Sequence, residues 1–382
     1  MKRVRFIDAA RGTAMLFVLL SHFLEAFFPN PDWFDVFLGD ITDIASPTFV
    51  LISGSLIGFL CRVRPDAFPQ LRTKLIDRGL FLLTVGHVIL LGGHYAMTPT
   101  LRWLPITDAV GFSMLISPWL VAKLGRTQRV VTGLAVFAIN WLVVALWTPA
   151  AGAEAVKETF FGSQDLRFYA YAFPLLPWFC VDLIATTIGD RLGELYVQKN
   201  IPAVGRLLDR LWVGGVLSAM AVAVGLKAVS MMWPVTNPRF AEVEYGMRAV
   251  QQRIPPGPVY ILFYGGLGLL LLRVSFAAEQ RVGRWVKTYV DYASAVGQVS
   301  LFTFVWQYYV YYTGIHLLQP YLPFQWAWPV YFVATVALVI GAALWWHRSN
   351  YNKYITVGYS YFVRARHPKA DMERLRDQYG NA

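Results

Sequence analysis

The sequence has few cysteines and few charged side chains for its length. Among its 382 residues there are two cysteines, Cys61 and Cys180, and 15% of the residues are Asp, Glu, Lys or Arg. Two isolated cysteines without CxxC or CxxH spacing exclude a disulfide framework, and we expect no bound metal. A soluble domain carries roughly a quarter charged residues, because its surface faces water. The composition therefore excludes an ordinary soluble domain.

Apolar and aromatic residues are abundant instead, at 56% and 16% of the chain. A helix needs about 20 mostly apolar residues to cross a bilayer, and aromatic residues gather at the two membrane interfaces. These properties predict an all-α polytopic membrane protein with about ten transmembrane helices in one bundle. The expected spans lie near residues 10–29, 41–61, 79–97, 105–122, 130–148, 168–190, 211–233, 258–274, 297–317 and 328–346.

Basic residues divide unequally between the two sides of this bundle. With the N-terminus placed in the cytoplasm, most of the 34 lysines and arginines fall in cytoplasmic loops. The pattern follows the positive-inside rule and predicts that both termini are cytoplasmic. We therefore attribute the net charge of +11 to topology, and we expect a lipid bilayer rather than nucleic acid as the partner. The remaining basic residues are Arg102, Lys157, Arg167, Lys227, Arg239, Arg248 and Arg253.

The chain divides into two parts of different composition. Residues 1–346 form the predicted transmembrane domain, and residues 347–382 form a polar, basic cytoplasmic tail. Such a tail is expected along the membrane surface or partly disordered. The N-terminal apolar run is interrupted by His22 and Glu25 and is followed by further spans, so it does not fit a cleaved signal peptide. The oligomeric state stays open, a homo-oligomer included.

The first predicted helix carries the most informative polar residues. Arg11 and His22 are eleven residues apart, close to three turns, so they share one face about 16 Å apart along the helix. Polar groups are costly in lipid, so His22 should face the bundle interior or a watered cavity. Its imidazole can accept a proton from a hydroxyl or an amine. The alternative is a histidine that only hydrogen-bonds two helices.

Other ionisable residues fall inside predicted spans. Glu25 lies one turn beyond His22 and is expected to orient its ring. His87 is either a second base facing the cavity or a hydrogen-bonding residue of the core, and His94 is expected at the outer interface. Asp108 and Asp182 occur in spans interrupted by proline. Because broken backbone near an acid suggests a cavity wall, we expect both acids to line the cavity.

Four ordered segments resemble a known family of membrane enzymes. They are the Arg11-X10-His22 spacing, residues 43–54 with Asp43 and a Ser-Gly pair, the FPLLPWF run at 173–179, and the GQVSLFTF run at 297–304. Together they resemble the transmembrane acyltransferase superfamily: the Arg-X10-His spacing is similar to the motif of the acyltransferase-3 family, and the FPLLPWF run is similar to the glucosaminide-acetyltransferase-like branch. The same transmembrane acyltransferase superfamily includes the heparan-α-glucosaminide N-acetyltransferases and the glucan succinyltransferases.

The resemblance implies an activity and a location. The enzyme would take an acyl group from cytoplasmic acyl-CoA, most often acetyl-CoA, with no permanently bound cofactor. It would transfer the group to a hydroxyl or an amine of a sugar or cell-envelope glycan, in a bacterial inner membrane. His22 would be the general base, with Glu25 and Asp43 as further catalytic residues. Asp43 would orient His22 or bind the acceptor, although a helix-start residue without chemistry explains it equally well.

Coenzyme A carries phosphates, which need cationic partners at the cytoplasmic mouth. Arg11, Arg72 and Arg78 are the candidates, and the alternative for these loop arginines is topology alone. The chain also departs from the family pattern at two places. Gln307 stands where the late helix often has a histidine, and the loop before the second helix has Trp33 but no histidine. His22 is therefore the best-placed base.

Two other classes of function fit part of the pattern. In a proton-coupled transporter of a small solute, His22, Glu25, Asp43, Asp108 and Asp182 would form a proton relay through proline-broken helices. In a scaffold or sensor, the same residues would only hold helices together. The transporter does not explain the Arg-X10-His spacing or the order of the four segments.

Overall fold

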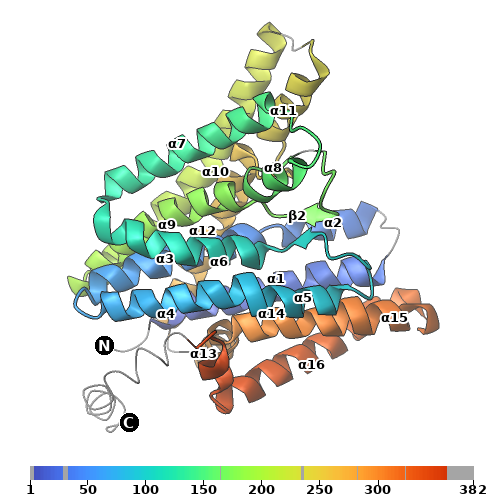
Figure 1. Cartoon of the computed structure of the whole chain (residues 1–382). Helices are drawn as coiled ribbons and strands as arrows, with labels where there is room; N and C mark the ends of the chain where they lie inside the picture. Colours follow the sequence, from blue (N-terminus) through green and yellow to red (C-terminus); the bar gives the residue numbers. More distant parts are fainter. Residues whose placement is uncertain are drawn as a thin grey trace.

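The computed structural model describes residues 4–28, 33–163, 165–233, 236–281, 283–322 and 324–358, and this part of the chain is almost entirely helical (Figure 1). Strands β1 (Trp103–Leu104) and β2 (Tyr171–Ala172) form one short parallel pair. The first half of the chain contributes α1 (Arg5–Phe27), α2 (Trp33–Thr42), α3 (Ala45–Val63), α4 (Phe68–Phe81), α5 (His87–His94), α6 (Ile106–Lys123), α7 (Arg126–Leu146) and α8 (Glu154–Phe160).

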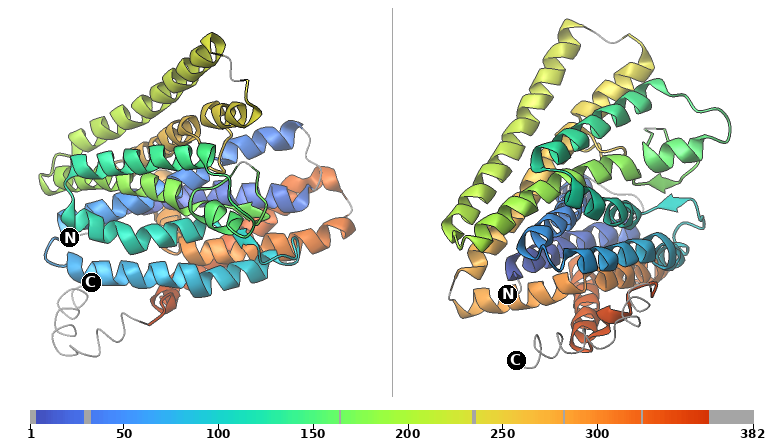
Figure 2. Two further views of the ribbon diagram at one scale, coloured as in Figure 1. Left: turned by 45° about the horizontal axis from the view of Figure 1, so that its top comes forward. Right: turned by 60° about the vertical axis from the view of Figure 1, so that its left-hand side comes forward.

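The second half begins with the long helices α9 and α10. Helix α10 packs mainly against α12 and stands at the edge of the bundle (Figure 2). The elements are α9 (Leu175–Val197), α10 (Ile201–Met232), α11 (Pro238–Arg248), α12 (Pro258–Glu279), α13 (Arg284–Gln298), α14 (Ser300–Tyr308), α15 (His316–Leu318) and α16 (Trp328–Arg348). Short 3-10 turns complete them: η3 (Gln319–Tyr321), η4 (Gln325–Ala327) and η5 (Tyr351–Tyr354).

Seven stretches of the described chain are long and apolar enough to cross a membrane. The prediction of a multi-pass integral membrane protein is therefore confirmed. Three predicted spans, 105–122, 168–190 and 297–317, are not among the seven. They correspond to α6, α9 and the α14–α15 segment. The seven stretches are Arg5–Phe27, Val36–Val63, Phe68–His94, Arg126–Leu146, Ile201–Met232, Pro258–Glu279 and Trp328–Arg348.

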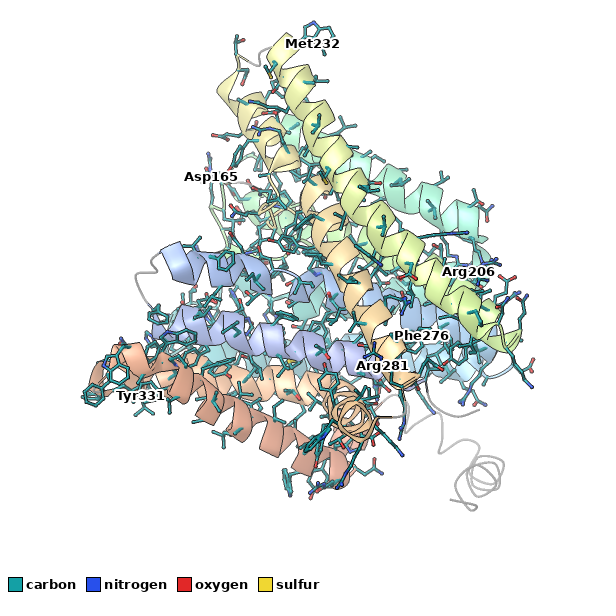
Figure 3. All side chains as sticks on the ribbon, turned by 180° about the vertical axis from the view of Figure 1, so that it is seen from behind. Asp165, Arg206, Met232, Phe276, Arg281 and Tyr331 are labelled. Carbon is teal, nitrogen blue, oxygen red and sulfur yellow. The ribbon has the colours of Figure 1, made fainter. Side chains whose placement is uncertain are left out.

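Two elements differ from the predicted spans in position. Helix α9 begins at Leu175, seven residues after the predicted start at 168, because residues 165–173 form a loop and β2 and Pro174 is the N-cap. Residues 284–298, expected to lie mostly in a cytoplasmic loop, form α13. In Figure 3, α13 is seen nearly end-on beside the Arg281 label, whereas α1 and α16 lie across the view. Helix α13 therefore crosses the spanning helices.

Helices α3 and α9 pack with their backbones in contact. A Cβ atom at Gly58 would collide with the carbonyl oxygen of Thr186, and one at Gly189 would collide with that of Ser55. Gly54 faces the carbonyl oxygen of Asp182 in the same way. Small residues allow such close approach, which maximises van der Waals contact where lipid supplies no hydrophobic driving force. This pair forms one rigid side of the bundle.

Two π-helical turns interrupt long helices in different halves of the chain. Residues Leu82–Gly86 form η1 between α4 and α5, and residues Tyr309–Ile315 form η2 between α14 and α15. Helix α5 and η2 are joined by two hydrogen bonds. The Tyr309 hydroxyl donates to the Ile89 carbonyl at 2.8 Å, and the Thr313 hydroxyl donates to the Gly93 carbonyl at 2.9 Å. Single π turns often occur at functional sites, where they redirect side chains.

We expect Gly58→Ala to destabilise the protein. The added methyl group must push α3 away from α9, and overpacking of this kind costs about 1–3 kcal/mol. Gly225→Ala on α10 is the matched control, because nothing lies within 4 Å of a Cβ atom there. Thermal unfolding in detergent should show a lower Tm for Gly58→Ala alone. Equal Tm values for the two variants would contradict the close α3–α9 contact.

Candidate functional site

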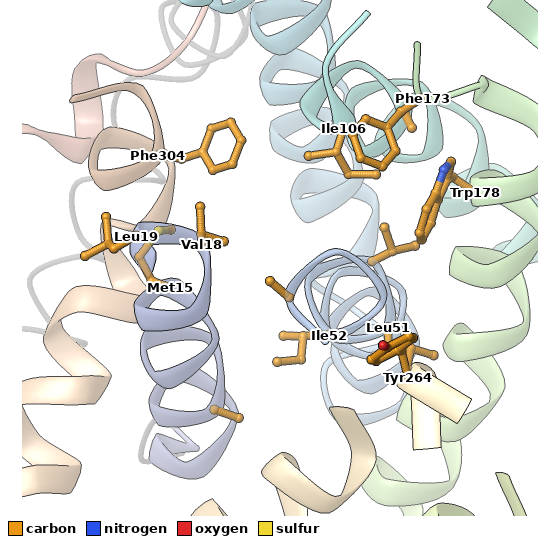
Figure 4. Packing of buried hydrophobic residues seen from close by; sticks show 14 of the residues in the cluster. Met15, Val18, Leu19, Leu51, Ile52, Ile106, Phe173, Trp178, Tyr264 and Phe304 are labelled. Atoms are coloured by element: carbon orange, nitrogen blue, oxygen red, sulfur yellow. The ribbon is translucent and has the colours of Figure 1, made fainter. Parts of the chain in front are cut away.

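A cavity of about 350 Å³ lies inside the bundle and is lined by residues from both halves of the chain. Val18 and Phe304 form one side, and Ile106 and Phe173 form the other (Figure 4). The lining near the start of α1 is polar: Arg11, Arg78, Gln298 and Asn352. The lining near the end of α1 is also polar: Glu25, Thr42, Asp43, Thr98 and Arg253. The cavity thus follows α1 along most of its length.

Both residues of the Arg-X10-His spacing line this cavity, in the order that the helix period predicts. Arg11 lies toward its first end, and His22 lies farther along the same face of α1. The His22 Nδ1 atom is 2.9 Å from the Oε1 atom of Gln307. Three rings surround the imidazole: Phe304, Tyr308 and Tyr312, at centroid distances of 5.9, 5.1 and 5.3 Å.

The hydrogen bonds of Gln307 determine which His22 nitrogen carries the proton. Gln307 is fully buried, and its Nε2 donates to the Phe304 carbonyl at 3.1 Å. Its Oε1 atom therefore faces His22, and a carbonyl oxygen can only accept. His22 Nδ1 must then be the donor, which leaves Nε2 of the neutral ring with a free lone pair. The geometry thus prepares Nε2 as a proton acceptor.

Glu25 lines the cavity but does not hold the His22 ring. Its Oε2 atom accepts a hydrogen bond of 2.6 Å from the Tyr312 hydroxyl. The expectation that Glu25 orients the ring is therefore wrong, because Gln307 takes that position. Glu25, His94 and Arg253 line the same cavity as His22. The carboxylate supplies charge to the site rather than orientation.

His94 is buried in the cavity wall at the C-terminus of α5, where the apolar stretch Phe68–His94 ends, and its position at the outer interface stays a prediction. Its ring stacks on Trp103 with centroids 4.5 Å apart and planes at 13°. It also meets Tyr312 edge-on at 4.7 Å. These contacts follow from the β1 segment, which brings Trp103 over the end of α5. A second imidazole therefore shares the cavity with His22.

An ion pair lies at the end of the cavity that is farther from Arg11. Arg253 Nη1 donates to Asp43 Oδ1 at 3.2 Å, and the Tyr260 hydroxyl donates to the Asp43 carbonyl at 3.3 Å. The Arg253 guanidinium also lies over the Tyr171 ring at 5.6 Å. Burial raises the pKa of Tyr171 to about 12, so this phenol stays neutral beside the cation. Asp43 thus contacts Arg253 and does not orient His22.

The opposite end carries the arginines expected to bind the donor. Arg11 and Arg78 line the cavity, whereas Arg72 lies outside the lining with its guanidinium 3.9 Å from the centre of the Trp119 ring. The C-terminal residue of α13, Gln298, completes this end: its carbonyl accepts from Asn352 Nδ2 at 2.7 Å. Two of the three predicted arginines are therefore brought together. In the described residues no cluster of His, Cys, Asp or Glu has the arrangement of a metal site.

A family model matches residues 3–210, which is more than half of the chain, and its description is heparan-alpha-glucosaminide N-acetyltransferase, catalytic. The chain belongs to this family. The predicted membership of the transmembrane acyltransferases is thereby confirmed, and the enzyme class is acyltransferase. No curated protein sequence matches the chain.

The N-acetyltransferase family match covers only part of the cavity wall. Arg11, His22, Asp43 and Arg78 lie within the matched residues. Gln307, which holds the His22 ring, and Arg253, which pairs with Asp43, lie beyond residue 210. The site is therefore completed by helices and a loop outside the matched region.

Three predicted cavity residues do not line the cavity. The Nδ1 atom of His87 lies 2.6 Å from Asp108 Oδ2, and Asp182 is fully buried and accepts from the Ser117 hydroxyl at 2.6 Å. The expectation fails because proline does not open the backbone there. Helix α6 continues through Pro118, and α9 places Pro174 at its N-cap and Pro177 in its first turn. Proline costs little in a first turn, where its missing N–H has no partner in the helix.

The sequence did not predict several residues that line this cavity or hold His22. Tyr308 and Tyr312 are not among the residues that the sequence analysis singled out, and Gln307 entered it only as a departure from the family pattern. A signal existed, because Phe304, Tyr308 and Tyr312 recur every four residues and so share one helix face. Arg253 had no comparable signal, since it reaches the cavity from a loop some 210 residues after Asp43.

We expect Gln307→Met to lower acyl transfer about fivefold, because one hydrogen bond that holds the His22 tautomer is worth about 1 kcal/mol. Gln307→Glu retains an acceptor oxygen at the same reach and should lose less activity. The control is Gln198→Met at the exposed C-cap of α9. Initial rates with labelled acetyl-CoA measure the effect. Full activity in Gln307→Met would contradict the positioning role.

Proposed function

We propose that the protein transfers an acetyl group from acetyl-CoA to an amine or a hydroxyl of a sugar, with His22 as the general base. The observation that carries this proposal is one continuous cavity lined by Arg11, His22 and Asp43. It places a cationic end, an imidazole and an acidic end in this order along the length of α1, with Asp43 contributed by the α2–α3 turn. The family match supports acetyl-CoA as the donor and an amino sugar as an acceptor.

The proposed topology has ten spans with both termini in the cytoplasm. Helices α6 and α9 and the α14–α15 segment would add three spans to the seven that hydropathy identifies. Helix α9 carries Asp182, Asp190, Arg191 and Glu194, and α14–α15 is interrupted by η2, so neither reads as a long apolar run. The start of α1 and the end of α16 lie toward the same end of the bundle (Figure 1), which supports an even number of spans.

Donor binding follows from the charges at the cytoplasmic end. Coenzyme A is a polyanion, and guanidinium groups form strong, directional hydrogen bonds with phosphate. Arg11 and Arg78 line the mouth that this topology places in the cytoplasm. The acetyl thioester would extend along the face of α1 toward His22, which lies about 16 Å farther along the helix.

The chemistry uses the free lone pair of His22. Its Nε2 atom takes a proton from the acceptor N–H or O–H, and the acceptor atom attacks the carbonyl carbon of the thioester. As the new C–N or C–O bond forms, the C–S bond breaks. The leaving coenzyme A thiolate receives the proton from the imidazolium, which restores neutral His22. Gln307 keeps the ring in the required tautomer throughout.

The acceptor would enter from the end lined by Glu25, Asp43 and Arg253. The carboxylates of Glu25 and Asp43 suit the hydroxyl or ammonium groups of a sugar, since both oxygens accept hydrogen bonds. Trp103 lines the same part of the cavity and offers an apolar ring. We therefore place a saccharide of the cell envelope at this end, and the bacterial inner membrane is the proposed location.

We expect His22→Ala to lower acyl transfer by about 10²- to 10⁴-fold, the usual contribution of a general base. The matched control is His316→Ala, because His316 lies on α15 outside the cavity lining. Purified protein, radiolabelled acetyl-CoA and a panel of sugars provide the assay. The Tm of each variant confirms its folding. Undiminished transfer by folded His22→Ala would remove His22 from the mechanism.

We expect Arg11→Gln and Arg78→Gln each to raise the Kd for acetyl-CoA about tenfold or more, because each removes a charge-assisted hydrogen bond to phosphate. Lys123→Gln is the control, since Lys123 is an exposed cation at the end of α6 outside the lining. Equilibrium binding of labelled acetyl-CoA gives the three values. Unchanged Kd values for both arginine variants would place the donor elsewhere.

A further inference from the structure

Helix α13 exposes a stripe of large aromatic side chains. Trp285, Tyr289 and Tyr292 follow a spacing of four and three residues, so they share one face. Their exposed fractions are 85%, 44% and 51%. An aromatic stripe of this kind on the surface of a membrane protein suits the boundary between headgroups and acyl chains, where Trp and Tyr are enriched.

A second face of α13 is fixed against α1. Val290, Ser294 and Gly297 are buried. A Cβ atom at Gly297 would collide with the carbonyl oxygen of Asp8, and one at Gly12 would collide with that of Ala293. The two backbones are therefore in contact, and α13 is held rigidly across the first turns of α1.

The third face of α13 is charged. Arg284, Lys287 and Asp291 follow a spacing of three and four residues, and Arg281 lies just before the helix. Asp291 is paired with Arg5 of α1, Nη1 to Oδ1 at 2.9 Å. At 100° per residue, the aromatic face is about 135–140° from each of the other two faces, which are about 85° apart. The exposed charge that this face offers a partner is therefore positive.

The orientation of α13 suits a helix that lies in the plane of a membrane surface. It is seen nearly end-on in Figure 3, whereas the spanning helices α1 and α16 lie across that view. It crosses α1 near Gly12, at the end of the bundle where Arg11 and Arg78 line the cavity. Interfacial helices combine an aromatic or apolar face with a basic face. The cytoplasmic leaflet is rich in anionic lipid, which attracts such basic residues.

We propose that α13 is an interfacial helix that binds anionic phospholipid in the cytoplasmic leaflet. The Trp285–Tyr289–Tyr292 stripe lies among the upper acyl chains, and Arg281, Arg284 and Lys287 contact the headgroup phosphates. The aromatic stripe favours a lipid over a soluble polyanion, because a soluble ligand would not cover three exposed rings. The assignment of this site to the cytoplasmic leaflet rests on the proposed topology. The lipid site itself does not depend on the proposed reaction.

The position of α13 links this lipid site to the donor mouth. The helix ends at Gln298, which lines the cavity and whose Oε1 lies 3.1 Å from His347 Nε2. Its carbonyl also holds Asn352, another lining residue. Lipid bound along α13 would therefore stabilise the mouth through which acetyl-CoA enters.

Native mass spectrometry of the protein from nanodiscs tests the lipid contact without an activity assay. Discs contain phosphatidylcholine alone or mixed with phosphatidylglycerol. We expect the wild type to retain phosphatidylglycerol preferentially, and the double variant Arg284→Gln/Lys287→Gln to lose this preference several-fold. The control Arg206→Gln/Arg210→Gln removes two basic residues from the start of α10, near the Arg206 label in Figure 3, and should keep the preference.

Equal retention by the wild type and by both double variants would overturn the proposal. Displacement of phosphatidylglycerol by acetyl-CoA would also overturn it, because the basic face would then belong to the donor site. If the wild type is a dimer and Trp285→Ala dissociates it, the aromatic stripe contacts a second copy of the chain, and the lipid site is excluded.

Quenching of Trp fluorescence tests the depth of the aromatic stripe. In lipid brominated near the headgroup, Trp285→Phe should lower the quenched fraction, since one interfacial indole has been removed. If aqueous iodide, and not brominated lipid, quenches the emission that Trp285→Phe removes, then Trp285 faces water and the interfacial helix is excluded.

Discussion

The hydrogen bond between His22 and Gln307 is the contact on which the rest of the site depends. An imidazole inside a membrane helix needs partners from within the protein, because lipid provides none. Gln307 supplies one partner to Nδ1, and its own Nε2 is satisfied by the Phe304 carbonyl, so the arrangement has no free rotation. The same bond ties α1 to α14. Reactivity at Nε2 and cohesion of the two helices therefore have a common origin.

A polar cavity in a membrane bundle must resist collapse, and two helix pairs provide this resistance. On one side, α3 and α9 touch at Gly54, Gly58 and Gly189, and on the other, α1 and α13 touch at Gly12 and Gly297. Backbone contact leaves neither pair room to shift toward the cavity. The rings of Phe304, Tyr308 and Tyr312 pack against His22 and line the cavity with it.

Helical periodicity correctly predicted the relative positions of side chains that lie on a single helix. The shared face of Arg11 and His22 followed from their spacing, and both residues line the cavity. The hydrogen-bond partner of a side chain depends on several elements and could not be predicted from one helix. Glu25 accepts a hydrogen bond from Tyr312 rather than from the His22 ring. Asp108 is hydrogen-bonded to His87, outside the cavity lining. A search for spans also overlooked α13, because its apolar residues form a face and not a continuous run.

The two ends of the cavity draw on different parts of the chain, and this division bears on specificity. The end proposed to bind the donor contains Arg11 and Arg78, which lie inside the family-matched residues 3–210, and the opposite end is the proposed acceptor end. At the acceptor end, Asp43 lies within the match, but its partner Arg253 comes from a loop beyond it. Because Arg253 neutralises Asp43 and shares the cavity with Glu25, the charge presented to an acceptor is set jointly by both parts. If the proposed acceptor end is correct, a change confined to residues 249–257 alters the choice of acceptor and leaves His22, its Gln307 contact and the Arg11–Arg78 end in place.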